Sequence, residues 1–155
     1  QRYSDWLKEN MQSQRIRLKG DEMRLIALFE SVTGATSKDC LIDEESGRII
    51  LVTKKGEMGL AIGKAGRNIN TLRKMTGRQI EVVEDADEPE QLIKNSLAPA
   101  KVKTIRITEK PNSKIAVVEV DSRDKAIAIG KNGRTIDKTR LLAKRYFQID
   151  HVIIA

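Results

Sequence analysis

A four-residue turn that occurs twice constrains this chain more than any other feature. Residues 63–66 read Gly-Lys-Ala-Gly and residues 130–133 read Gly-Lys-Asn-Gly, 67 positions later, each with Ile before it and Arg after it. Apolar and basic positions keep this register over nineteen residues, from Leu60 and Ile127 to Arg78 and Arg145. Such a repeat indicates one structural unit that is used twice.

The length of the chain fits two small domains. At 155 residues it is long enough for one ordinary domain or two small ones, and the repeat favours two. We expect an N-terminal extension over residues 1–19, which stays unassigned, a first domain over residues 20–86 and a second domain over residues 87–155.

Apolar periodicity and turn residues predict the same order of elements in both domains: helix, strand, strand, short helix, Gly-x-x-Gly turn, longer helix and strand, which is an α+β fold. In the first domain the predicted elements are Asp21–Val32, Cys40–Asp43, Arg48–Thr53, Glu57–Ile62, a helix from Arg67 that closes at Gly77, and Gln79–Val83. In the second they are Asp87–Leu97, Val102–Thr108, Ile115–Val120, a short helix capped by Asp121 or Ser122 that runs through Ile129, Arg134–Lys144, and Tyr146–Ile154.

The net charge of +7 favours an anionic partner, although a charge of this size also keeps a small protein in solution. The distribution of the charge is more informative. Residues 54–78 hold seven bases and one acid, residues 123–145 hold eight bases and two acids, and the six acids of residues 81–90 lie between them. Positive charge is therefore concentrated on the two repeats.

The chemistry of the turn points to a phosphate backbone. Glycine at both ends allows a sharp bend and lets an anion approach the main chain. The turn also opens a helix, whose first N–H groups and positive dipole end attract anions. Lys64 and Lys131 inside the turns, with Arg67 and Arg134 after them, add cations at the same point. We therefore expect a polyanionic ligand.

Other kinds of glycine loop fit less well. A Walker loop has Ser or Thr after Gly-Lys, whereas Ala65 and Asn132 stand there, and a dinucleotide-binding loop follows a strand directly. A purely structural corner between two helices stays open as an alternative for a single copy. The repeated Lys and Arg favour binding instead.

The rest of the sequence gives no sign of catalysis or of a cofactor. One Cys and one His exclude internal disulfides and the common zinc frameworks, so Cys40 is expected to be a small buried residue and His151 a surface or strand residue. The absence of a signal-peptide pattern and of a long apolar run favours a cytoplasmic protein. The acids between the repeats fit a solvated domain boundary better than a catalytic cluster. We expect no enzyme activity, no cofactor, no metal, no small-molecule substrate and no membrane contact.

Residues 62–69 (Ile-Gly-Lys-Ala-Gly-Arg-Asn-Ile) and 129–136 (Ile-Gly-Lys-Asn-Gly-Arg-Thr-Ile) resemble the signature of K homology (KH) domains. The Gly-x-x-Gly loop of that family clamps about four nucleotides of single-stranded nucleic acid. The order of elements resembles the type II form, and two such domains in tandem over residues 20–155 resemble the short archaeal members of the NusA family. For each domain the resemblance implies a three-stranded mixed sheet packed against three helices on one face.

The resemblance also implies a function. It implies a transcription termination or antitermination factor that holds single-stranded nascent RNA, with RNA polymerase as a further partner. A ribosome-associated or ribosome-assembly KH protein is the alternative. The expected RNA-binding residues are the two turns and their flanks: Ile62, Gly63, Lys64, Ala65, Gly66, Arg67, Ile69 and Arg73 in the first domain, and Ile129, Gly130, Lys131, Asn132, Gly133, Arg134, Ile136 and Arg140 in the second.

The same resemblance predicts a groove beside each turn. Its apolar floor would be formed by Ile62, Ile69, Ile129 and Ile136, for which an ordinary core role stays open, and its edge by Gln79–Val82 and Phe147–Asp150. The short linker Asp85–Glu88 predicts that the two domains pack together and present one continuous track. The base preference, the length of RNA bound, the use of both grooves, the polymerase contact surface and the oligomeric state cannot be read from the sequence.

Overall fold

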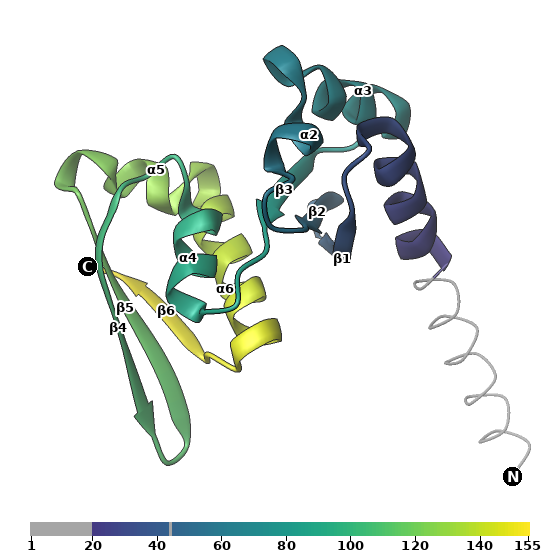
Figure 1. Ribbon diagram of the computed structural model, residues 1–155. Coiled ribbons are helices and arrows are strands. Elements are labelled where there is room, and N and C mark those ends of the chain that lie inside the picture. The colour runs from purple at the N-terminus through teal and green to yellow at the C-terminus, as the bar shows by residue number, and fades with distance from the viewer. Residues whose placement is uncertain (1–19, 44) are drawn as a thin grey trace, which may run out of the picture. The chain divides into compact units, whose positions relative to one another are not determined.

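The computed structural model describes residues 20–43 and 45–155, which form two compact units divided between Val83 and Glu84 (Figure 1). The predicted extension over residues 1–19 lies outside the described residues. The expected boundary after residue 86, and the expectation that the two units present one continuous track, stay predictions.

Unit 1 is a three-stranded mixed sheet with three helices on one face. Its elements are a helix over residues 20–33, β1 (Ser37–Asp43), β2 (Arg48–Thr53), α2 (Met58–Ile62), the 3-10 turn η1 (Lys64–Gly66), α3 (Arg67–Thr76) and β3 (Ile80–Glu84). β2 is the central strand and pairs antiparallel with β1. Ile49 and Leu51 of β2 pack with Phe29 and Leu72 in the core between the sheet and the helices.

Unit 2 repeats this architecture. Its elements are α4 (Pro89–Leu97), β4 (Val102–Lys110), β5 (Ser113–Val120), η2 (Ser122–Asp124), α5 (Lys125–Ile129), η3 (Lys131–Gly133), α6 (Arg134–Phe147) and β6 (His151–Ile154). The central strand β5 pairs antiparallel with β4 and parallel with β6. Figure 1 shows the long β4–β5 hairpin reaching beyond the short β6. Ala116 and Val118 of β5 pack with Ile93 and Ile136 in the core.

Local signals explain most element boundaries. Pro89 occupies the first turn of α4, where its missing N–H costs nothing, and Gly77 ends α3 in the left-handed conformation with φ of 67°. The Asp121 side chain accepts a hydrogen bond from the N–H of Arg123 at 3.0 Å, so it caps η2 rather than α5. The hairpins are longer than expected: β1 begins at Ser37, and a two-residue turn joins β4 to β5.

The end of unit 2 differs from the sequence-based expectation. α6 has 14 residues where α3 has ten, and β6 begins only at His151. The predicted strand Tyr146–Ile154 is therefore wrong at its start, and the predicted groove edge Phe147–Asp150 is not a strand.

The reason for the longer helix is tertiary packing. Tyr146 and Phe147 favour strands by propensity, and no glycine after Gly133 marks the end of the helix. Instead Gln148 takes a left-handed φ of 54°, and Ile149, which is 1% exposed, donates its N–H to the Ala143 carbonyl at 3.2 Å. Burial of Ile149 in the core holds the added turn in place.

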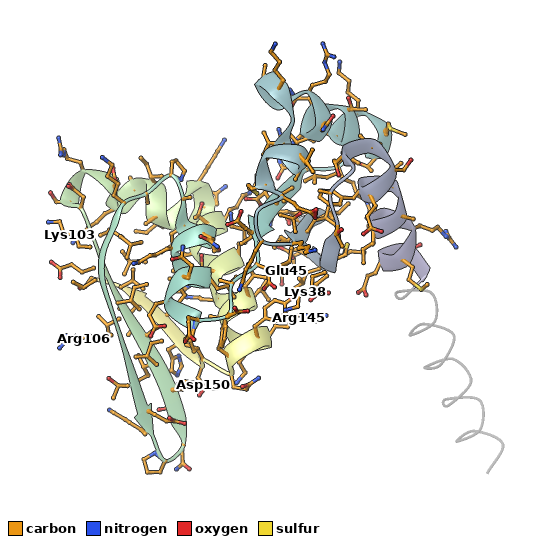
Figure 2. The ribbon with its side chains drawn as sticks, viewed as in Figure 1. Lys38, Glu45, Lys103, Arg106, Arg145 and Asp150 are labelled. Atoms are coloured by element: carbon orange, nitrogen blue, oxygen red, sulfur yellow. The ribbon has the colours of Figure 1, made fainter. Side chains whose placement is uncertain are left out.

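Asp150 joins the end of α6 to the sheet. Its carboxylate accepts a hydrogen bond from the Lys144 ammonium and another from the N–H of Lys114, at 2.8 Å; Figure 2 shows Asp150 near the start of β6. The Lys144 hydrogen bond, followed by that of the Lys114 N–H, holds the pKa of Asp150 below its usual range.

We expect Asp150→Asn to lower the free energy of unfolding at neutral pH and to have little effect in strong acid. A carboxyl whose pKa is depressed by folding stabilises the fold above its unfolded pKa, about 3.9, and this contribution is lost as the pH falls through the lower folded pKa. Urea unfolding of both proteins at neutral pH and near pH 2 measures the difference. Glu109→Gln, an exposed acid in β4, is the control and should change far less. A decrease of equal size at both pH values would contradict this electrostatic role.

Candidate nucleic-acid interface

Both Gly-x-x-Gly turns form the same sharp corner between a short helix and a longer one. The first glycines, Gly63 and Gly130, have φ of 77° and 79°, and the second glycines have φ of 75° and 74°. Ala65 and Asn132 between them also lie in the left-handed region, with φ of 55° and 56°. The sequence repeat is therefore a repeat of backbone geometry.

The first glycine of each corner is required by packing as well as by its φ. A Cβ on Gly63 would lie 2.9 Å from the backbone nitrogen of Asn68, and a Cβ on Gly130 would lie 2.8 Å from the backbone nitrogen of Thr135 and closer still to its Oγ1. A Cβ on the second glycine of each corner, Gly66 or Gly133, would have its nearest neighbouring atom at 3.5 or 3.7 Å, so only the positive φ requires glycine there. Contacts between the turn and the following helix thus fix the shape of the corner.

The outer side of each corner is exposed. Lys64, Ala65, Lys131 and Asn132 are all exposed to solvent. In unit 1 they adjoin a pocket lined by Lys64, Ala65, Arg67, Asn70, Thr71 and Lys74. The last four are spaced i, i+3, i+4 and i+7 and so share one face of α3. Asn70, Thr71 and Lys74 are not among the residues expected from the sequence, although their helical spacing after Arg67 places them on its face.

The same helix face is less cationic in unit 2. At the matching positions α6 has Arg134, Asp137, Lys138 and Leu141. Asp137 forms an ion pair with Arg140 at 3.4 Å, Lys138 is only 7% exposed, and Leu141 is 43% exposed. With fewer accessible cations, the corner of unit 2 attracts an anion less strongly than that of unit 1.

The four isoleucines of the expected groove floor divide into two pairs. Ile69 and Ile136 are 7% and 5% exposed and belong to the cores of their units. Ile62 is half-buried and Ile129 is 44% exposed. Of these four isoleucines, only Ile62 and Ile129 therefore leave apolar surface accessible beside the turns.

Arg73 and Arg140 hold the closing strands. Arg73 donates from Nε and Nη2 to the carbonyl of Ile80 at 3.3 and 3.0 Å, and Arg140 donates from Nε to the carbonyl of Val152 at 3.3 Å. In each case the guanidinium links the long helix to the strand at the edge of the sheet. Their expected contact with RNA stays a prediction; in the structure each also donates from Nη1 to a side chain of its own helix, Asn70 or Asp137.

The residue between the lysine and the second glycine allows a stability test. We expect Ala65→Asn to stabilise unit 1, and Asn132→Ala to destabilise unit 2, by about 0.5–1 kcal/mol each, because a left-handed φ is costly for Ala and tolerated by Asn. Urea unfolding of the full chain measures both changes. Ala126→Asn, on the exposed side of α5, is the control and should destabilise, because Asn is a poor helix former. Equal signs for Ala65→Asn and Ala126→Asn would contradict the expectation.

The other candidate residues have structural places. Cys40 is 1% exposed, and burial, followed by the nearby acids Glu22 and Asp39, raises the pKa of its thiol to about 12, so it is a core residue and not a reactive one. His151 is exposed at the start of β6.

Over residues 20–43 and 45–155, no cluster of three or more His, Cys, Asp or Glu residues is arranged to hold a metal ion. The helices in this part of the chain are too short or too polar to cross a membrane.

Comparison with known proteins identifies both domains. The KH domain family matches residues 24–87, and the family of NusA-like second KH domains matches residues 89–152. The crystal structure of the protein APE1850 is similar with a TM-score of 0.79 and 38% sequence identity, over 87% of this chain and 98% of that one. The fold expected from the resemblance, two tandem KH domains of α+β type, is thus confirmed.

Curated relatives are similar over most of the chain. A probable transcription termination protein NusA of Halococcus morrhuae is 40% identical over 141 residues, which cover 91% of this chain and 99% of the relative. A protein of the same name from Methanococcus vannielii is 32% identical over 138 residues, 89% of this chain and 79% of the relative. KH-domain NusA proteins are RNA-binding factors and not enzymes. The chain therefore belongs to the NusA family, as a member built of two tandem KH domains.

Proposed function

We propose that this chain is a transcription termination factor that holds single-stranded nascent RNA in the Gly-x-x-Gly corners of its two KH domains. The observation that carries the proposal is the repeated corner, in which an exposed lysine stands at the start of a long helix twice with the same backbone angles. The names of the curated relatives support the role in termination. The same family membership supports a role in antitermination and RNA polymerase as a partner.

The phosphate backbone binds at the corner. The N–H groups that open α3 and α6 lie at the positive end of the helix dipole, and the first of them, on Arg67 and Arg134, donate to the carbonyls of Lys64 and Lys131. Lys64 and Lys131 add a cation beside them. Such contacts fix the position of the strand without reading its bases.

The bases lie over Ile62 or Ile129 toward the closing strand. β3 and β6 are edge strands, and alternate backbone groups of an edge strand point away from the sheet. In β3 the outward carbonyl of Ile80 already accepts a hydrogen bond from Arg73. The next residue whose backbone N–H and C=O point outward is therefore Val82. In β6 the carbonyl of Val152 accepts a hydrogen bond from Arg140 in the same way, and the next outward N–H and C=O belong to Ile154. These groups can pair with the edges of bases and give the site its preference.

Binding to matched oligonucleotides tests the RNA contact. Fluorescence anisotropy should show tighter binding of an unpaired RNA than of a duplex of the same sequence. The affinity should also fall with salt, by a slope of about 0.7 in log–log terms for each phosphate neutralised on a single strand. A preference for duplex RNA would contradict the proposal.

Co-purification tests the cellular role. A tagged full-length chain should recover RNA polymerase subunits rather than ribosomal subunits, and recovery should persist after nuclease treatment if the polymerase contact is direct. Recovery of ribosomal subunits alone would favour a ribosome-associated protein with the same RNA-binding corners.

A further inference from the structure

We propose that a basic pocket on unit 2, outside the Gly-x-x-Gly corner, binds a phosphate of the same RNA strand. Its charged lining residues are Lys103, Arg106, Lys125 and Glu119, and Thr104 and Ser122 add hydroxyl groups. The inference rests on the proposed RNA binding and extends it to a surface that the family's Gly-x-x-Gly loop does not include.

Strand residues on the face of the sheet opposite the helices form one side of the pocket, and Lys125 lines it from the start of α5. In the β4–β5 pair Thr104 stands opposite Glu119 and Arg106 opposite Val117. Ala116 and Val118 of β5 belong to the core under the helices, so the alternating residues Val117 and Glu119 face the other way. Figure 2 shows Lys103 and Arg106 projecting outward from β4.

The charge of the pocket suits a phosphate. Lys103, Arg106 and Lys125 are exposed and bring three positive charges against the one carboxylate of Glu119. That carboxylate accepts a hydrogen bond from the Thr104 hydroxyl at 3.1 Å. An excess of cations, with a guanidinium among them, favours binding of a phosphate group.

The corresponding face of unit 1 keeps only one of these cations, Lys38 in the bulge that matches Lys103, and its β2 residues Ile50 and Val52 are buried. The equivalent strand pairs in unit 1 are Leu41 with Ile50 and Asp39 with Val52. Met58 begins α2 where Lys125 begins α5. Unit 1 therefore forms the same fold with Leu41 and Met58 at the places of Arg106 and Lys125, so the fold does not require these two cations in unit 2.

The pocket is within reach of a strand held at the corner of unit 2. Lys125 begins α5, and Gly130 follows the end of this five-residue helix. At 1.5 Å per residue α5 is about 8 Å long, which corresponds to about two nucleotides at the 3.4 Å rise of a stacked strand. A strand clamped over about four nucleotides at the corner thus reaches the pocket with about two more. This second contact compensates for the weaker corner of unit 2, and it needs no partner other than the RNA already bound.

Oligonucleotide length separates the pocket from the corner. The full chain carrying Lys64→Asp and Ala65→Asp reports on unit 2, and NMR titration measures its affinity for a tetranucleotide and an octanucleotide of the same base composition. In this background we expect Arg106→Gln with Lys125→Gln to lower the octanucleotide affinity about three- to tenfold and to leave the tetranucleotide affinity unchanged. The salt slope for the octanucleotide should fall by about 0.7 for each phosphate that the variant no longer neutralises.

A charge-matched variant is the control. Lys94→Gln with Lys110→Gln removes the same charge from exposed positions of unit 2 outside the pocket, and should change the octanucleotide affinity less than about twofold. An equal decrease in both variants, or no decrease in either, overturns the pocket assignment. The assignment is also overturned if an acidic peptide shifts the NMR resonances of the pocket residues while the pocket variant keeps the octanucleotide affinity of its background. If the unmodified chain binds no RNA of either length, the proposed function itself fails, which is a different result.

Discussion

Replacing Lys64 and Ala65 together with Asp is expected to lower the affinity for single-stranded RNA at least about tenfold, because it places negative charge where the phosphate binds. Lys131→Asp with Asn132→Asp should also lower the RNA affinity, but by a smaller factor, because the helix face beside the corner of unit 2 carries fewer accessible cations. The fold should survive both changes. The second position of each pair has φ of 55° or 56°, a conformation that Asp tolerates.

A matched change elsewhere controls for net charge. Lys110→Asp with Asn112→Asp, at the exposed tip of the β4–β5 hairpin, alters the same residue types by the same charge as the change at unit 2. Anisotropy at one fixed salt concentration measures the affinity, and circular dichroism checks the fold. If both corners act on one strand, combining the two corner changes should cost about a hundredfold or more. Unchanged binding by a folded corner variant would instead indicate a protein-docking scaffold for which RNA is secondary.

Gly130→Ala is expected to destabilise unit 2 by about 3 kcal/mol or more, the largest effect on stability that we expect from a single methyl group in this chain. The added Cβ would lie 2.8 Å from the backbone nitrogen of Thr135 and closer still to its Oγ1. It would also sit at φ of 79° and ψ of 168°, a backbone conformation that is essentially restricted to glycine. The corner between α5 and α6 would have to open.

Gly133→Ala is the matched control within the same turn. It should cost only about 1 kcal/mol, since its φ of 74° is an ordinary left-handed one and the nearest atom to its Cβ is 3.7 Å away. Urea unfolding together with amide exchange in β5 measures both variants. Adding Thr135→Ala to Gly130→Ala should recover only part of the stability, because the backbone nitrogen remains in place. Similar destabilisation by Gly130→Ala and Gly133→Ala would show that packing at the first glycine is unimportant.

Local signals in the sequence were sufficient to place the corners. Glycine, lysine and arginine at fixed spacing predicted both turns and the helices that follow them, because positive φ angles and helix starts depend on nearby residues. Gly77 marked the end of α3 in the same way. The end of α6 depends instead on the burial of Ile149 in the core, which no local signal reports.

The roles of individual site residues needed three-dimensional contacts. Arg73 and Arg140 are predicted RNA contacts, and only the position of the closing strands shows that their guanidinium groups also bind backbone carbonyls. Ile69 and Ile136 could equally have been core or groove residues until their burial was known. The basic pocket of unit 2 depends on the pairing of Thr104 with Glu119 and of Arg106 with Val117, which hairpin length and register determine.

The added turn of α6 limits how parts of the two domains can be exchanged. The long helices begin 67 residues apart, at Arg67 and Arg134, whereas the closing strands begin 71 residues apart, at Ile80 and His151. A chimaera spliced inside the first ten residues of these helices joins equivalent positions of α3 and α6. A chimaera spliced after these ten residues, still at the 67-residue offset, would place the last turn of α6 where the recipient domain requires the segment that leads into its closing strand. An exchange at the 67-residue offset therefore joins equivalent structure only before this junction, and beyond it the matching offset is 71 residues.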